Sequence, residues 1–161
     1  MKRRRGATIF LRIVIVGIAV GALALLLWAP RVEGRNVGAD LVTIYFRDPF
    51  LAFMYLGSLP FFVALFHAFK LLGHIARDEA FSQAAVNTLR NIKYCALLLV
   101  AALVGGMAYI RLASGDDDPA GAIAVGILVT FATLVVATAA AIFQELLQNA
   151  VDFKSENDLT V

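Results

Sequence analysis

Four long apolar stretches restrict what this sequence can fold into more than any other feature. They cover residues 7–29, 50–72, 92–111 and 119–144. A helix needs about 20 mostly apolar residues to cross a hydrocarbon core of about 30 Å. Each stretch is apolar around the full helical circumference, which suits contact with lipid. Open β-strands are disfavoured because lipid cannot satisfy their free backbone groups. We therefore predict a single all-α domain, a bundle of four transmembrane helices.

The composition excludes a water-soluble domain. Of the 161 residues, 61% are apolar and 16% are charged, whereas an average soluble protein is roughly 45–50% apolar and about 25% charged. The net charge of +2 does not indicate nucleic-acid binding. The basic residues at the N-terminus are better explained by the positive-inside rule and by interaction with anionic lipid headgroups. The single cysteine, Cys95, cannot form an internal disulfide and is expected to pack. Membrane lipids are the expected partners, and direct nucleic-acid binding is not expected.

The basic residues predict the orientation of the chain. With the N-terminus inside, ten Lys and Arg residues fall on the inner side and four on the outer side. The inner set is Lys2, Arg3, Arg4, Arg5, Arg12, Lys70, Arg77, Arg90, Lys93 and Lys154, and the outer set is Arg31, Arg35, Arg47 and Arg111. Inner loops carry the excess of basic residues, so both termini are predicted to be cytoplasmic. The first span is interpreted as an uncleaved signal anchor, since apolar residues 25–28 follow its small-residue triplet.

The connection between the second and third stretches is predicted to project into the cytoplasm. The helical pattern of the second stretch continues to Arg77, and Ser82 is a good N-cap for the next helix. Phe81 and Val86 occupy the two positions of a hydrophobic staple. A helix from Gln83 to residue 110 would be about 42 Å long, which exceeds the hydrocarbon core by roughly two turns.

The last stretch is expected to begin with a cap and to continue past the membrane. Asp118 is predicted to cap this helix with Pro119 in its first position. The acidic run that ends at Asp118 is explained by capping and solvation rather than by a metal ion. Beyond the membrane the helix is expected to continue to residue 151, and residues 152–161 are expected to form a flexible tail.

Polar residues near the inner ends of the helices form a candidate cytoplasmic interaction seam. His67, Lys70 and His74 have the spacing of one helix face. Histidine pairs can hold metals, but neither a metalloprotease pattern nor a cysteine pair accompanies them, so no metal and no cofactor are expected. Glu145 is predicted to face Arg90 or Lys93. The seam comprises His67, Lys70, His74, Phe81, Ser82, Arg90, Lys93 and Glu145.

Small residues and one proline predict details of the packing. Small residues four apart let helices approach closely in lipid. Such sets are Gly17 and Gly21, Ala101 and Gly105, Ala102 and Gly106, and Thr133, Ala137 and Ala141. Pro60 removes a backbone hydrogen bond within the second span, where a kink is expected.

The inner hairpin and the end of the chain resemble a known family. The residues that carry the resemblance are Leu65-Phe66, Phe69-Lys70-Leu71-Leu72, Phe81-Ser82, Val86-Asn87, Leu89-Arg90, Ile92 and Glu156-Asn157-Asp158-Leu159-Thr160-Val161. This pattern is similar to that of the bacterial membrane proteins called domain of unknown function twenty-nine seventy-five. The resemblance implies a bacterial inner-membrane protein of about this size. Members often stand beside a small helix-turn-helix regulator, which implies a sensing or regulatory role by context. The family supplies no catalytic residues.

Two functions are carried forward. Because no nucleophile elbow, phosphate-binding glycine loop or paired-carboxylate site occurs in the sequence, we expect a protein that is not an enzyme. The first expectation is a membrane protein that senses or regulates through its hairpin and tail, with a protein partner or a second copy. The alternative is a small transporter or channel subunit that uses the Pro60 kink and the threonines of the last span. That alternative requires a polar cavity reaching mid-membrane.

Overall fold

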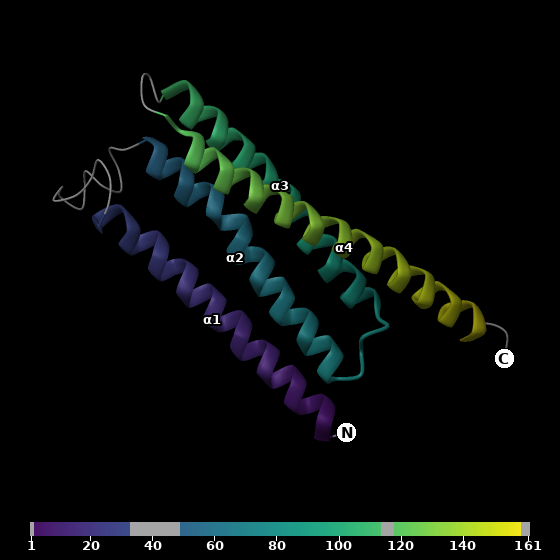
Figure 1. Cartoon of the computed structure of the whole chain (residues 1–161). Coiled ribbons are helices and arrows are strands. Elements are labelled where there is room, and N and C mark those ends of the chain that lie inside the picture. Colours follow the sequence, from purple (N-terminus) through teal and green to yellow (C-terminus); the bar gives the residue numbers. More distant parts are fainter. Residues whose placement is uncertain (1, 33–48, 114–117, 159–161) are drawn as a thin grey trace.

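The computed structural model describes residues 2–32, 49–113 and 118–158. The described residues form four helices: α1 (Lys2–Val32), α2 (Pro49–Ala76), α3 (Gln83–Ala113) and α4 (Ala120–Asp158), as Figure 1 shows. Each contains a segment long and apolar enough to cross a membrane, which confirms the all-α prediction with four candidate spans. The loop between α1 and α2, the first two residues of the acidic run, and residues 159–161 lie outside the described residues.

The helices pack mainly against their neighbours in sequence. α1 contacts α2, α2 contacts α3, and α3 contacts α4, and other pairs of these helices have few or no contacts. In Figure 1, α1 lies at one edge and α4 crosses α3, while the described ends of the chain lie at the same end of the molecule as the α2–α3 connection. We call that end the hairpin end, defined by residues 77–82. The opposite end, where a cavity lined by residues such as Phe50, Ile110 and Val125 lies, is called the cavity end. The bundle is therefore open, with α1 as its outlying helix.

The helices extend beyond the predicted spans. α3 begins at Gln83, as predicted, but α4 continues to Asp158 through most of the segment expected to be a flexible tail. Two side-chain bonds accompany this extension: Gln148 donates to the Asp152 carboxylate at 2.8 Å, and Ser155 donates to the Asp152 carbonyl at 2.8 Å. Contacts between residues four apart support an exposed helix. α2 runs through Pro60 as one helix.

The tightest packing lies at the hairpin end. Val86 is fully buried, and Leu89, Ile92 and Ala140 form a buried cluster between α3 and α4. Partly buried Ala68 and Leu71 of α2 and Leu147 of α4 pack against this cluster. Burial of leucine- and isoleucine-sized side chains is the main source of packing energy in such a core. The hairpin end therefore joins α2, α3 and α4 into one unit.

The small residues behave differently in different helices. A Cβ atom added at Gly57 of α2 would lie 3.2 Å from the Cβ of Ala102 in α3, and one added at Gly106 would lie 3.5 Å from Phe53. The predicted pair of Ala102 and Gly106 therefore lies where α2 and α3 approach closely. In contrast, no described atom lies within 4 Å of a Cβ added at Gly17 or Gly21. The predicted pair of Gly17 and Gly21 therefore does not pack closely against another described helix of this chain.

Candidate functional site

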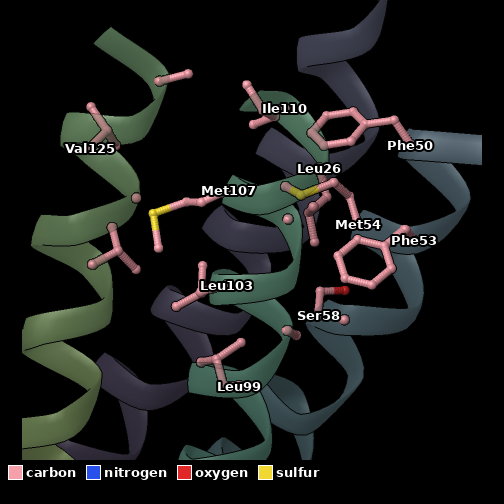
Figure 2. Close-up of a pocket in the computed structure, with 16 residues that line it drawn as sticks. Leu26, Phe50, Phe53, Met54, Ser58, Leu99, Leu103, Met107, Ile110 and Val125 are labelled. Carbon is pink, nitrogen blue, oxygen red and sulfur yellow. The ribbon is translucent and has the colours of Figure 1, made fainter. Parts of the chain in front are cut away.

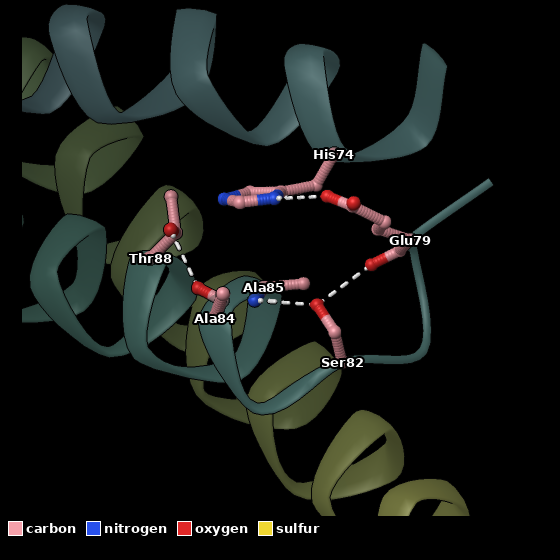
Figure 3. A network of polar contacts seen from close by, with 6 residues as sticks. All are labelled: His74, Glu79, Ser82, Ala84, Ala85 and Thr88. Carbon is pink, nitrogen blue, oxygen red and sulfur yellow. Dashed lines mark hydrogen bonds and ion pairs between the residues drawn. The ribbon is translucent and has the colours of Figure 1, made fainter. Parts of the chain in front are cut away.

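The hairpin end contains a network of polar contacts at the C-terminus of α2 and the N-terminus of α3 (Figure 3). Asp78 has a left-handed backbone with φ of 60°. The Glu79 N–H donates to the His74 carbonyl at 2.9 Å, and the Asp78 N–H donates to the Ile75 carbonyl at 3.3 Å. These two bonds form a Schellman motif, in which the left-handed residue is usually glycine. The His74 ring and the Glu79 carboxylate also approach to 3.5 Å.

The predicted cap of α3 is confirmed. The Ala85 N–H donates to the Ser82 hydroxyl at 3.3 Å, and the same hydroxyl donates to the Glu79 carbonyl at 2.7 Å. Ser82 therefore links the end of the turn to the first turn of α3 (Figure 3). The predicted staple is not evident in the burial, because Val86 is fully buried while Phe81 remains 63% exposed. Phe81 is an exposed aromatic side chain next to the cap.

Polar contacts between α3 and α4 continue this network. Lys93 donates to the Gln144 side-chain oxygen at 2.8 Å, and Gln83 donates to the Gln148 side-chain oxygen at 3.1 Å. The sequence predicts that Glu145 faces Arg90 or Lys93, whereas the hydrogen-bond partner of Lys93 on α4 is Gln144. Within the described residues Glu145 is exposed and forms no ion pair with either residue. One residue along a helix is a rotation of about 100°, so Gln144, which accepts from Lys93, and Glu145 lie on different sides of α4.

The seam predicted from the sequence is divided in the structure. His74 and Ser82 join the hairpin network, and Lys93 joins the contact with α4. His67 and Lys70 instead lie beside the ring of Phe66, with the Lys70 ammonium 5.9 Å from the ring centroid. Arg90 is exposed.

Four polar residues that form hydrogen bonds or ion pairs at the hairpin end and between α3 and α4 were not predicted from the sequence. They are Glu79, Gln83, Gln144 and Gln148. The available signal was the placement of glutamines in helical stretches that extend beyond the apolar spans.

The cavity end holds a cavity of about 320 Å³ between α2, α3 and α4, with Leu26 of α1 also in its lining, as Figure 2 shows. Its lining includes Phe53, Leu103, Met107, Val125 and Gly126. The lining is apolar apart from Ser58, whose hydroxyl donates to a backbone carbonyl of its own helix, that of Tyr55, at 2.7 Å. The sequence interpretation missed this cavity, although glycines in all three of these helices were a signal that side-chain volume is lacking there.

Two comparisons with known proteins extend this description. Residues 39–161 match the family described as protein of unknown function DUF2975. The chain is also 42% identical over 160 residues to the uncharacterized membrane protein YoaS of Bacillus subtilis, and the match covers 98% of this chain and 99% of that protein. No solved structure matches. The family match covers α2, α3 and α4 completely, and the relative covers nearly the whole chain, so the chain belongs to the DUF2975 family of membrane proteins.

Proposed function

We propose that the chain is a non-enzymatic protein of the bacterial inner membrane that receives or transmits a signal through the hairpin end. The surface proposed to contact a partner combines the α2–α3 turn with the last turns of α4. The observation that carries the proposal is a pair of exposed aromatic side chains at this end. Phe81 is 63% exposed and Phe153 is 67% exposed. Exposed apolar groups with polar surroundings are typical of interaction surfaces when they lie in water.

The lengths of the helices support an aqueous position for this surface. α3 has 31 residues and α4 has 39, which correspond to about 46 Å and about 58 Å. A hydrocarbon core of about 30 Å leaves several turns of each helix outside. Polar contacts between Gln83 and Gln148 and between Gln148 and Asp152 lie at the hairpin end, whereas the cavity at the opposite end is lined by apolar residues apart from Ser58. This distribution favours projection of the hairpin end rather than of the cavity end.

The basic residues support a cytoplasmic position of the same end. Arg77, Arg90 and Lys154 lie in or beside the hairpin and the end of α4, and four basic residues occupy positions 2–5. Cytoplasmic segments carry the excess of Lys and Arg. The partner that we propose is a cytoplasmic protein, and a second copy of the chain is the competing occupant.

The test is site-specific photocrosslinking in living cells that express the full chain. A photoreactive amino acid replaces Phe81 or Phe153, and the matched control replaces Leu112, which is 86% exposed at the cavity end. We expect crosslinked products of defined mass from the first two positions and none of that mass from the third. Products at twice the mass of the chain would identify a second copy instead. Equal labelling at all three positions, or a cytoplasmic activity reporter at residue 161 that stays inactive, would overturn the proposal.

The apolar lining of the cavity gives little support to the alternative function, a transporter or channel subunit. Passage of a polar solute requires polar groups that reach mid-membrane. The threonines of α4 named for that role donate to their own helix: Thr130 to Gly126, Thr133 to Val129 and Thr138 to Leu134. Hydroxyls that donate to the preceding turn leave only acceptor capacity for a solute.

A further inference from the structure

Arg12 is a cation of α1 that lies against α2 and has no ion-pair partner among the described residues. Its guanidinium carbon lies 4.8 Å from the centroid of the Phe69 ring. A Cβ atom added at Gly73 would lie 3.2 Å from the Arg12 Nη2 atom, so the absent side chain of Gly73 makes room for the guanidinium. The Arg12 Nε atom is buried and has no hydrogen-bond partner in the described structure. No described carboxylate forms an ion pair with Arg12.

Lys70 adds a second cation on the adjacent surface of α2. Lys70 follows Phe69 directly, and Phe66, Lys70 and Gly73 have the spacing of one side of a helix. The Lys70 ammonium lies over the Phe66 ring at 5.9 Å and forms no ion pair with a described carboxylate. The inner part of α2 therefore carries two cations over aromatic rings, Arg12 of α1 over Phe69 and Lys70 over Phe66, and neither forms an ion pair with a described carboxylate.

The depth of Arg12 suggests what neutralises it. Arg12 lies six residues into the apolar segment of α1, which begins at Gly6, and six residues correspond to about 9 Å. A long basic side chain at this depth reaches the headgroup layer, and an unpaired charge within the apolar region is unfavourable. The planar guanidinium carries five N–H donors in a geometry that suits phosphate oxygens.

We propose that Arg12, with Lys70 as a second cation on α2, binds the phosphate of an anionic phospholipid where Arg12 meets α2. The phosphate accepts hydrogen bonds from the free guanidinium N–H groups and supplies the missing negative charge. Phe69 supports one face of the guanidinium, and Gly73 leaves the space in which it lies. This site is independent of the hairpin surface that contacts the proposed partner.

The test measures lipid binding to the full chain by native mass spectrometry from a neutral detergent. The probes are phosphatidylglycerol, phosphatidylcholine of the same acyl chains, and inorganic phosphate. We expect the chain to bind phosphatidylglycerol in preference to phosphatidylcholine, and the preference to fall about fivefold in Arg12→Gln, the size expected for one cation near an anionic surface. Arg111→Gln removes the same charge at the cavity end and is expected to leave the preference unchanged.

Gly73→Val provides a second variant that retains both charges. The added side chain displaces the guanidinium from its position beside α2, so the preference for phosphatidylglycerol is expected to fall although the net charge stays the same. Circular dichroism and size-exclusion profiles equal to those of the parent chain establish that each variant is folded. Equal preference in the parent, Arg12→Gln and Arg111→Gln proteins would overturn the proposal. Binding of inorganic phosphate with loss of the lipid preference would assign the site to a free anion and would also overturn it.

Discussion

At the hairpin end, α3 and α4 meet through buried Val86, Leu89, Ile92 and Ala140, whereas at the cavity end the same two helices and α2 leave a space of about 320 Å³. The difference follows from side-chain volume. Branched aliphatic side chains fill the first region, while the lining of the second includes one glycine from each of α2, α3 and α4, namely Gly57, Gly106 and Gly126. Well-packed interiors resist displacement, and a void forfeits the contacts that would line it. Stability is therefore expected to concentrate at the hairpin end and adaptability at the cavity end.

Truncation in the buried cluster would test this comparison with the largest effect. Leu89→Ala removes a side chain that is 7% exposed, and such a change is expected to lower the free energy of unfolding by about 2–5 kcal/mol. Leu98→Ala on the same helix is the matched control, because Leu98 is 60% exposed. Denaturant titration in mixed micelles measures both. Equal losses in the two variants would mean that the hairpin end is not the stabilising region.

Two glycine substitutions would separate a close helix contact from the cavity. Gly57→Val places a branched side chain against Ala102, where a Cβ would already lie at 3.2 Å, so α2 and α3 must move apart. The expected loss is about 1–3 kcal/mol. At Gly126 an added Cβ would meet the flexible Met107 side chain. Methionine adapts readily and the cavity offers space, so Gly126→Ala is expected to change stability by less than about 1 kcal/mol.

These two substitutions are compared by thermal unfolding in one detergent. Both glycines line the cavity, so a larger loss for Gly126→Ala than for Gly57→Val would show that the close α2–α3 contact is not the tightest part of the cavity end.

Removal of the α3 cap has a smaller expected effect at the hairpin end. Ser82→Ala deletes the hydroxyl that accepts from the Ala85 N–H and donates to the Glu79 carbonyl. Loss of such a cap lowers stability by about 1 kcal/mol. Ser82→Asp retains an acceptor and is expected to recover most of the loss. Amide hydrogen exchange over residues 83–86 is expected to rise in the alanine variant, and unchanged exchange would contradict a structural role for the cap.

The smallest expected effect distinguishes two adjacent positions on α4. Gln144→Ala removes the acceptor of the Lys93 ammonium, and the expected loss is about 0.5 kcal/mol because Lys93 can extend toward water. Glu145→Ala alters an exposed side chain without an ion pair to Arg90 or Lys93 in the described residues and is expected to leave stability unchanged. A double-mutant cycle with Lys93→Met provides the measurement. Coupling of Lys93 to Glu145 instead would restore the original prediction.

The sequence predicted the elements better than their contacts. The apolar stretches located the four helices, and Ser82 located the start of α3, because length, hydropathy and capping chemistry act locally. The contact between α3 and α4 was harder to predict, because a one-residue step rotates a side chain by about 100° and the prediction named Glu145 rather than its neighbour. Its charge suggested a partner, but the helix register places the neutral Gln144 against Lys93.

The limits of α4 and the cavity depend on information beyond the local pattern. The polar composition of residues 152–158 suggested a loose tail, but bonds to Asp152 accompany a continuing helix there. The cavity depends on how glycines from three helices align, which spacing within one helix does not reveal. The division of the seam has the same origin, since Lys70 and Lys93 lie on helices whose relative rotation the sequence leaves open.

The placement of α1 has a consequence for how the chain is built. Among the described helices, α1 has extensive contacts only with α2. Near the cavity end, the Tyr55 hydroxyl donates a hydrogen bond to the Leu26 carbonyl at 2.9 Å and links the two helices. α1 is synthesised before α2, so it must exist without this packing partner until α2 emerges. Exposed apolar residues over most of the α1 surface suit both that early stage and its finished position.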